Sequence, residues 1–229
     1  MPQNGLKQQR GSARLSKTRT VVFCGLSIAL LTVSAWVSVP IWVIPVTLQT
    51  FVMVFIVLFL TPRQCMISLV AYLLLGAVGL PVFSSMRGGI GVIMGPTGGF
   101  LWGFLLGAIV ALFVLWLFRR GGIFTGKNSA ETSYKLRAAG LASGESNTAE
   151  SPYKLRAAGL PSGKRGYVLG LLVALVFLLV MYVCGWAQLV FITGMTPEAA
   201  FAAGVAPFVV IDIIKASFAV LVAQSIRIR

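Results

Sequence analysis

The sequence predicts an all-α integral membrane protein with six transmembrane helices and both termini in the cytoplasm. Hydrophobic residues make up 58% of its 229 residues, and they gather in long runs with almost no charge. Residues that end or break helices separate these runs. The basic residues cluster in alternate segments between the runs, as expected when cytoplasmic loops hold the positive charge.

Residues 1–20 are polar and carry five cations without an acid, which predicts a cytoplasmic tail. The apolar run Val21–Val39 follows and predicts the first span. A basic start, an apolar stretch and "VSA" at 33–35 also fit a cleavable signal peptide. We favour a span, because the run is long enough to cross a bilayer and its removal would spoil the charge pattern.

Five further runs predict spans two to six. They are Pro45–Leu60, Gln64–Leu80, Gly98–Phe118, Tyr167–Thr193 and Val205–Ile226. The second and third lie near the lower limit of ~17 residues for a crossing helix. Pro62 separates them, because proline has no amide hydrogen and ends the preceding helix.

The distribution of Lys and Arg fixes the predicted orientation. With six spans, 17 of the 19 basic residues lie on one side: five in the tail, Arg63, nine in 119–166, and Arg227 with Arg229. Arg87 lies in an outer loop, and Lys215 lies within a span. We therefore expect a multi-pass protein of the cell membrane whose cations contact anionic membrane lipid, and no nucleic acid as partner.

Residues 119–166 are predicted to be a flexible cytoplasmic insertion, because "YKLRAAGL" occurs at 134–141 and again at 153–160 among Gly, Ser and Pro. Each copy alternatively suits a short basic turn at the lipid headgroups. The segment "GGIFTGKN" at 121–128 resembles a phosphate-binding loop, but Asn128 stands where that motif needs Ser or Thr. The predicted organisation is a tail (1–20), helices one to four (21–118), the insertion, and helices five and six (167–229).

The composition disfavours an enzyme. The chain has no histidine and five acidic residues, and its three cysteines lie in apolar runs without a CxxC motif. A Ser-His or Cys-His nucleophile is therefore excluded, and a zinc site is not expected. We predict no catalytic residue, no metal and no cofactor.

Asp212 and Lys215 are the pair that most needs an explanation, because they lie within the apolar segment "PFVVIDIIKASFAV". Three residues apart on a helix, they share a face. Charges at membrane depth are costly, so the pair is expected to face a protein interior or a cavity. Two readings stay open: a polar ligand site, or an ion pair that ties helices together.

Several small residues complete the pattern. The outer loop before the fourth span is rich in glycine and carries Arg87, which could reach an anionic group. Gly99, Gly103 and Gly107 form GxxxG steps that predict close helix packing. Gly25 and Ala29 form a similar face on the first span, for packing or for docking a partner. Between spans five and six, Thr196 and Pro197 predict the start of a short outer helix.

Four segments resemble the BioY family, the biotin-specific S components of energy-coupling-factor (ECF) transporters. They are "PVTLQT" (45–50), "LLLGAVGLPVF" (73–83), "GGIGVIMGPTGGFLWGFLLGA" (88–108) and "GVAPFVVIDIIKA" (204–216). The resemblance implies an S-component-like fold of six helices with a biotin pocket near the outer face. The residues that it implies bind substrate are Asp212, Lys215, Arg87, Tyr182, Gln49, Thr47, Gly95 and Thr97.

The resemblance also implies a mechanism and partners. Asp212 would accept from the ureido nitrogens of biotin, Lys215 would donate to its carbonyl or steady Asp212, and Arg87 would meet its carboxylate. A transmembrane scaffold protein, docked at Gly25 and Ala29, and two ATPases would power uptake; self-association as a solitary transporter is the alternative. The rival functions are an S component for another vitamin and a structural membrane protein with a buried ion pair.

Overall fold

The computed structural model describes residues 3–40, 44–120 and 163–226 of the chain, and most of these are helical. The predicted insertion, with its duplicated segments, lies almost wholly outside the described residues. The elements are α1 (Gln3–Trp36), β1 (Ser38–Pro40), β2 (Pro45–Thr47), α2 (Gln49–Phe59), α3 (Pro62–Val78), the 3-10 turn η1 (Ser84–Met86), α4 (Ile90–Ile93), α5 (Gly98–Arg120), α7 (Lys164–Thr193), α8 (Pro197–Gly204) and α9 (Ala206–Ser225).

Four described helices are long and apolar enough to cross a membrane: the Thr18–Trp36 part of α1, and α5, α7 and α9. The predicted second and third spans are shorter. Helix α2 has 11 residues, which at ~1.5 Å per residue is about half of the ~30 Å hydrocarbon layer. Helix α3 has 17 residues and lies near the limit. Six crossing helices therefore remain a proposal.

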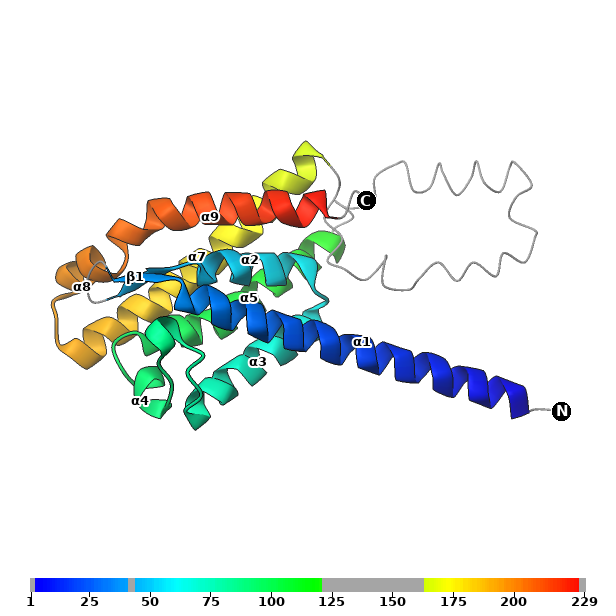
Figure 1. The fold of residues 1–229 in the computed structure, drawn as a ribbon. Helices are drawn as coiled ribbons and strands as arrows, with labels where there is room; N and C mark the ends of the chain where they lie inside the picture. The colour runs from blue at the N-terminus through cyan, green and yellow to red at the C-terminus, as the bar shows by residue number, and fades with distance from the viewer. Residues whose placement is uncertain (1–2, 41–43, 121–162, 227–229) are drawn as a thin grey trace.

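Helix α1 begins earlier than the sequence predicted. The helix starts at Gln3 rather than near Val21, so the basic segment continues the helix of the first apolar run. Lys, Arg and Gln are good helix formers, and the hydropathy boundary near residue 20 does not mark a break in the backbone. Figure 1 shows the first half of α1 extending beyond the other helices.

A two-stranded antiparallel ribbon corrects the all-α prediction. Ser38–Pro40 pairs with Pro45–Thr47, with Val39 opposite Val46. The sequence placed the end of the first span and the start of the second in these residues. Proline at positions 40 and 45 disfavours a helix interior, whereas Val and Thr suit an extended chain. The ribbon lies at one end of the bundle, beside the cavity described below.

Local signals set the helix ends that matter for the site. Thr61 caps α3: its hydroxyl accepts from the Gln64 amide, and the Gln64 side chain accepts from the Thr61 amide, with Pro62 first in the helix. Gly79 ends α3 with a φ of 111°, a conformation that favours glycine. The predicted short helix that begins at Thr196 and Pro197 is confirmed as α8, where Thr196 accepts from the Ala199 amide.

Helices α5 and α7 pack closely along the predicted glycine steps. A methyl group on Gly103 would lie 2.8 Å from both the Cα atom and the carbonyl oxygen of Met181, and one on Gly107 would lie 3.0 Å from the Phe177 carbonyl oxygen. As the residue number rises along α5 it falls along α7, so the two helices are antiparallel. The interpretation of the glycines as packing residues is confirmed.

Figure 1 shows that the bundle has two different ends. One end carries the turn between α2 and α3, the end of α5, the start of α7 and the end of α9. The opposite end carries β1, α4 and α8. Arg63, Arg119, Arg120, Lys164 and Arg165 belong to helix termini at the first end, and Arg87 belongs to the loop before α4 at the second. This arrangement agrees with the predicted charge asymmetry.

Candidate ligand-binding site

A cavity of about 710 Å³, including its open mouth, lies at the end of the bundle formed by β2 and α8. Much of the lining is apolar and aromatic. The aromatic side chains are Phe83 from the loop after α3, Phe100 and Phe104 from α5, Tyr182 from α7 and Phe208 from α9.

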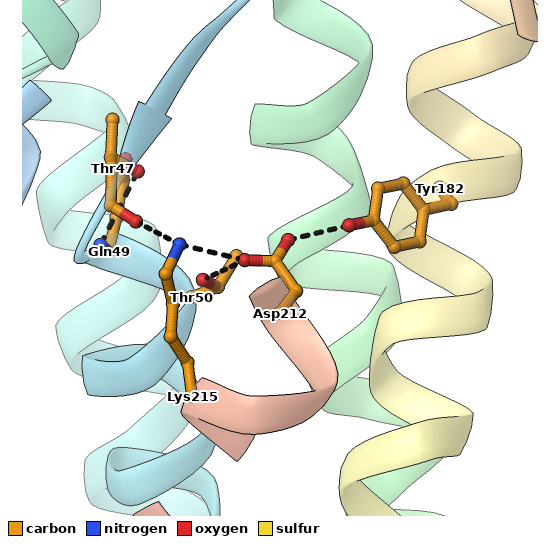
Figure 2. A network of polar contacts seen from close by, with 6 residues as sticks. All are labelled: Thr47, Gln49, Thr50, Tyr182, Asp212 and Lys215. Carbon is orange, nitrogen blue, oxygen red and sulfur yellow. Dashed lines mark hydrogen bonds and ion pairs between the residues drawn. The ribbon is translucent and has the colours of Figure 1, made fainter. Parts of the chain in front are cut away.

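The Asp212 carboxylate lies against this cavity at the centre of a polar network (Figure 2). Its Oδ1 accepts from Thr50 Oγ1 at 2.9 Å and from Lys215 Nζ at 2.9 Å, and its Oδ2 accepts from the Tyr182 hydroxyl at 2.6 Å. The donors come from α2, α7 and α9, and Asp212 is buried. Three donors compensate the desolvation of the carboxylate, and Oδ2 has capacity for one more.

Lys215 joins the same network from one turn further along α9. Besides its 2.9 Å ion pair with Asp212, its ammonium donates to the carbonyl oxygen of Thr47 at 2.7 Å. The predicted shared face of the two charges is therefore confirmed, and both line the cavity. Thr47 contributes through its backbone, at the point where strand β2 ends and α2 is about to begin.

Gln49 lines the cavity and belongs to a second, uncharged chain of hydrogen bonds. Its Nε2 donates to the Tyr72 hydroxyl at 2.9 Å, and that hydroxyl donates to the Val82 carbonyl oxygen at 2.8 Å. Tyr72 is 1% exposed, and its ring meets Phe83 edge-on at 5.6 Å. The chain thus connects α2, α3 and the loop that follows α3.

Arg87 and Thr97, two of the predicted substrate-binding residues, also line the cavity. Arg87 is exposed, and its Nε donates to the Ser84 carbonyl oxygen at 3.4 Å. Between Ser84 and Arg87, the residues Ser85 and Met86 adopt positive φ angles of 57° and 56°, which are costly for residues other than glycine. The loop therefore holds a constrained conformation beside the cavity.

Gly95 is the predicted substrate-binding residue that the structure does not place in the lining. Its carbonyl oxygen accepts from Gln188 Nε2 at 2.8 Å, and the same nitrogen donates to the Ile93 carbonyl oxygen at 3.0 Å. Gln188 thereby fastens α4 and the following loop to α7.

The predicted docking residues Gly25 and Ala29 lie on an exposed face of α1, away from the cavity. A methyl group on Gly25 would meet nothing within 4 Å. Cys24 and Ser27, on the other side of the same helix, are buried. The small residues therefore do not serve packing within the described part of the chain.

Sequence reasoning missed two polar residues of the site. Thr50 donates to a carboxylate 162 positions away, and Tyr72 orients Gln49. Each is a polar side chain in a largely apolar helix, which is a weaker form of the signal that singled out Asp212. Among the described residues, no group of three His, Cys, Asp or Glu side chains could hold a metal ion.

Comparison with known proteins identifies what this chain is similar to. The model of the BioY family matches residues 7–229. A probable biotin transporter BioY from Pyrococcus horikoshii is 32% identical over 211 residues, which cover 92% of this chain and 98% of that protein. The biotin transporter BioY of Thermotoga maritima is 44% identical over 92 residues, or 40% of this chain and 54% of that one.

A solved structure has the same fold. The crystal structure of the S component for biotin from an ECF-type ABC transporter superimposes with a TM-score of 0.68. The match covers 93% of each chain at 19% sequence identity. At 19% identity this structural similarity establishes the fold alone. Membership of the family rests on the family model and on the Pyrococcus horikoshii relative.

Proposed function

The chain belongs to the BioY family, and from this premise we propose that it binds biotin at the outer face of the cytoplasmic membrane and carries it inward as an ECF S component. The chain is a transport protein and not an enzyme. One observation carries the proposal: a buried, hydrogen-bonded carboxylate and an ammonium line a largely apolar cavity. Biotin matches such a site, since it combines an apolar chain with a ureido ring and a carboxylate.

In the proposed binding mode, Oδ2 of Asp212 accepts from a ureido nitrogen, because Oδ1 already accepts from Thr50 and Lys215. Lys215 holds the Asp212 carboxylate in place at the cavity through their 2.9 Å contact. Arg87 meets the biotin carboxylate at the mouth of the cavity, where its exposed guanidinium can move. Thr97 and Tyr182 complete the polar contacts, and the phenylalanines cover the apolar chain.

The proposed topology follows from the charge pattern. Six segments cross the membrane, with α2 and the β ribbon together forming one crossing, and both termini lie in the cytoplasm. The cavity end then faces outward. The insertion at 119–166 lies in the cytoplasm, contacts lipid headgroups through its cations, and separates the first four helices from the last two.

The proposed partners are a transmembrane scaffold protein and ATPase subunits of an energy-coupling module. The exposed small-residue face at Gly25 and Ala29 supports docking on α1, because small residues permit close approach of another helix. Self-association through this face would serve a solitary transporter. No cofactor is part of the proposed mechanism.

The test is ligand binding by the purified protein in detergent, with biotin compared against a panel of other vitamins. Saturable binding of biotin alone is the expected outcome. Selective binding of another vitamin would make the chain an S component of different specificity. Absence of any saturable binding would favour a structural protein in which the Asp212–Lys215 pair only joins helices.

A further inference from the structure

The uncharged chain Val82–Tyr72–Gln49 has a fixed direction. A backbone carbonyl can only accept, so the single hydroxyl proton of Tyr72 is donated to Val82. The Tyr72 oxygen can then only accept from its other neighbour, which lies 2.9 Å away on the Gln49 side chain. The Gln49 amide must therefore turn its NH₂ group toward Tyr72. In the opposite orientation, the Gln49 carbonyl oxygen would face a lone pair of the Tyr72 hydroxyl oxygen.

This direction decides what Gln49 presents to the cavity. With the nitrogen bound to Tyr72, the carbonyl oxygen Oε1 points to the other side of the amide. Oε1 accepts no hydrogen bond from the described residues. Some polar atoms of those residues are fully buried and lack a hydrogen-bond partner, and Oε1 is not among them. It therefore retains access to open space, and Gln49 lines the cavity.

We propose that Tyr72 is a positioning residue that fixes Gln49 with its carbonyl oxygen toward the cavity, where this oxygen accepts a hydrogen bond from an N–H group of the ligand. The inference rests on the proposed function and deepens it by assigning a second acceptor to the ureido ring. Asp212 has little capacity left for two ligand donors, since three protein donors already occupy it. Gln49 supplies the acceptor that Asp212 lacks.

The proposal also explains why a buried tyrosine lies behind the site rather than in it. A free glutamine amide can turn by 180° and offer the cavity a donor instead of an acceptor at small cost. Tyr72 prevents this turn, and its own position is held by the edge-on contact with Phe83. The site therefore selects ligands that donate from nitrogen over ligands that only accept at this position.

A double-mutant cycle tests the proposal, with biotin affinity measured on purified protein. Gln49→Met removes the acceptor at similar volume and is expected to weaken binding about tenfold. Tyr72→Phe keeps the ring and frees the amide to turn, with an expected loss of about fivefold. Because both changes remove the same contact, the double variant should bind no more weakly than Gln49→Met alone.

Ser68→Ala is the matched control, since Ser68 is buried on the same helix as Tyr72 and also donates to a backbone carbonyl, here that of Gln64. It should lower the melting temperature without changing biotin affinity. If the two losses multiply, so that the double variant binds biotin about fiftyfold more weakly than the wild type, the proposal is overturned. If Tyr72→Phe does not fold, wild-type affinity in Gln49→Met overturns it instead. A wild-type protein that binds no biotin would refute the proposed function first, which distinguishes the two failures.

Discussion

Two helix interfaces in this bundle are held together by opposite means. Helices α5 and α7 meet through glycines, so that their backbones approach within van der Waals contact and leave no room for a methyl group. At the cavity, helices α2 and α9 are instead joined by polar atoms, with Thr50 on one helix bonded to Asp212 on the other. Both interfaces border the same cavity.

The difference bears on how the site can respond to a ligand. A glycine-packed interface has one close-packed arrangement, and separating the helices would cost every contact along the seam. A polar interface can exchange partners, because a ligand donor can replace a protein donor on the same carboxylate. We therefore expect the α5–α7 pair to be the fixed wall of the cavity and the α2–α9 pair to be the wall that binding can rearrange.

The largest expected effect comes from breaking the fixed wall. In Gly103→Leu, the new side chain would collide with the Met181 backbone, which cannot move without separating α5 from α7. We expect destabilisation above ~3 kcal/mol and little folded protein. Gly25→Leu is the matched control, because its side chain would enter open space. Thermal unfolding in detergent measures both; similar melting temperatures would show that the seam is not tightly packed.

The polar wall should respond in binding rather than in folding. Asp212→Asn keeps the shape of the side chain but removes the charge and turns an NH₂ group toward donors. We expect biotin affinity to fall at least about tenfold, equivalent to roughly 1.4 kcal/mol, with a smaller change in melting temperature. The contrary reading, an ion pair that only joins helices, predicts an unstable variant whose surviving fraction binds biotin normally. Unchanged affinity in a folded variant would falsify the site assignment.

Removing the cation should have a smaller effect than removing the carboxylate. In Lys215→Met, Asp212 keeps its bonds from Thr50 and Tyr182, whereas the Thr47 carbonyl oxygen loses a donor. We expect a loss of about threefold to tenfold in biotin affinity. A biotin titration of the purified Lys215→Met protein measures this loss. A loss larger than that of Asp212→Asn would mean that Lys215, and not Asp212, contacts the ligand.

The sequence predicted those parts of this site that depend on local geometry. The shared face of Asp212 and Lys215 follows from helical spacing, and the glycine steps of α5 follow from the need for close packing. It did not predict that Thr47 binds Lys215 through its backbone carbonyl, because backbone contacts leave no trace in residue type. Thr50 was missed because its partner is 162 positions away and only the folded bundle brings them together.

The same limit explains the errors in the elements. Hydropathy marked Val39 and Pro45 as parts of spans, since an apolar strand and an apolar helix of a few residues read alike. The pairing of β1 with β2 joins residues on either side of a gap in sequence, and the hydropathy pattern does not record such a pairing. Helix α2 is short because part of its apolar run forms β2, which brings the Thr47 carbonyl oxygen next to Lys215.

The smallest effect on binding is expected from a third surface, which belongs to neither wall. Gly25 and Ala29 lie on an exposed face of α1 and do not line the cavity. A Gly25→Leu, Ala29→Leu double variant should therefore fold and bind biotin with wild-type affinity. A bulky pair on this face would nevertheless keep another helix from approaching closely, so uptake of biotin by cells should fall several-fold at equal protein level. A change in affinity would connect α1 to the cavity, and unchanged uptake would remove this face as the docking surface for a partner.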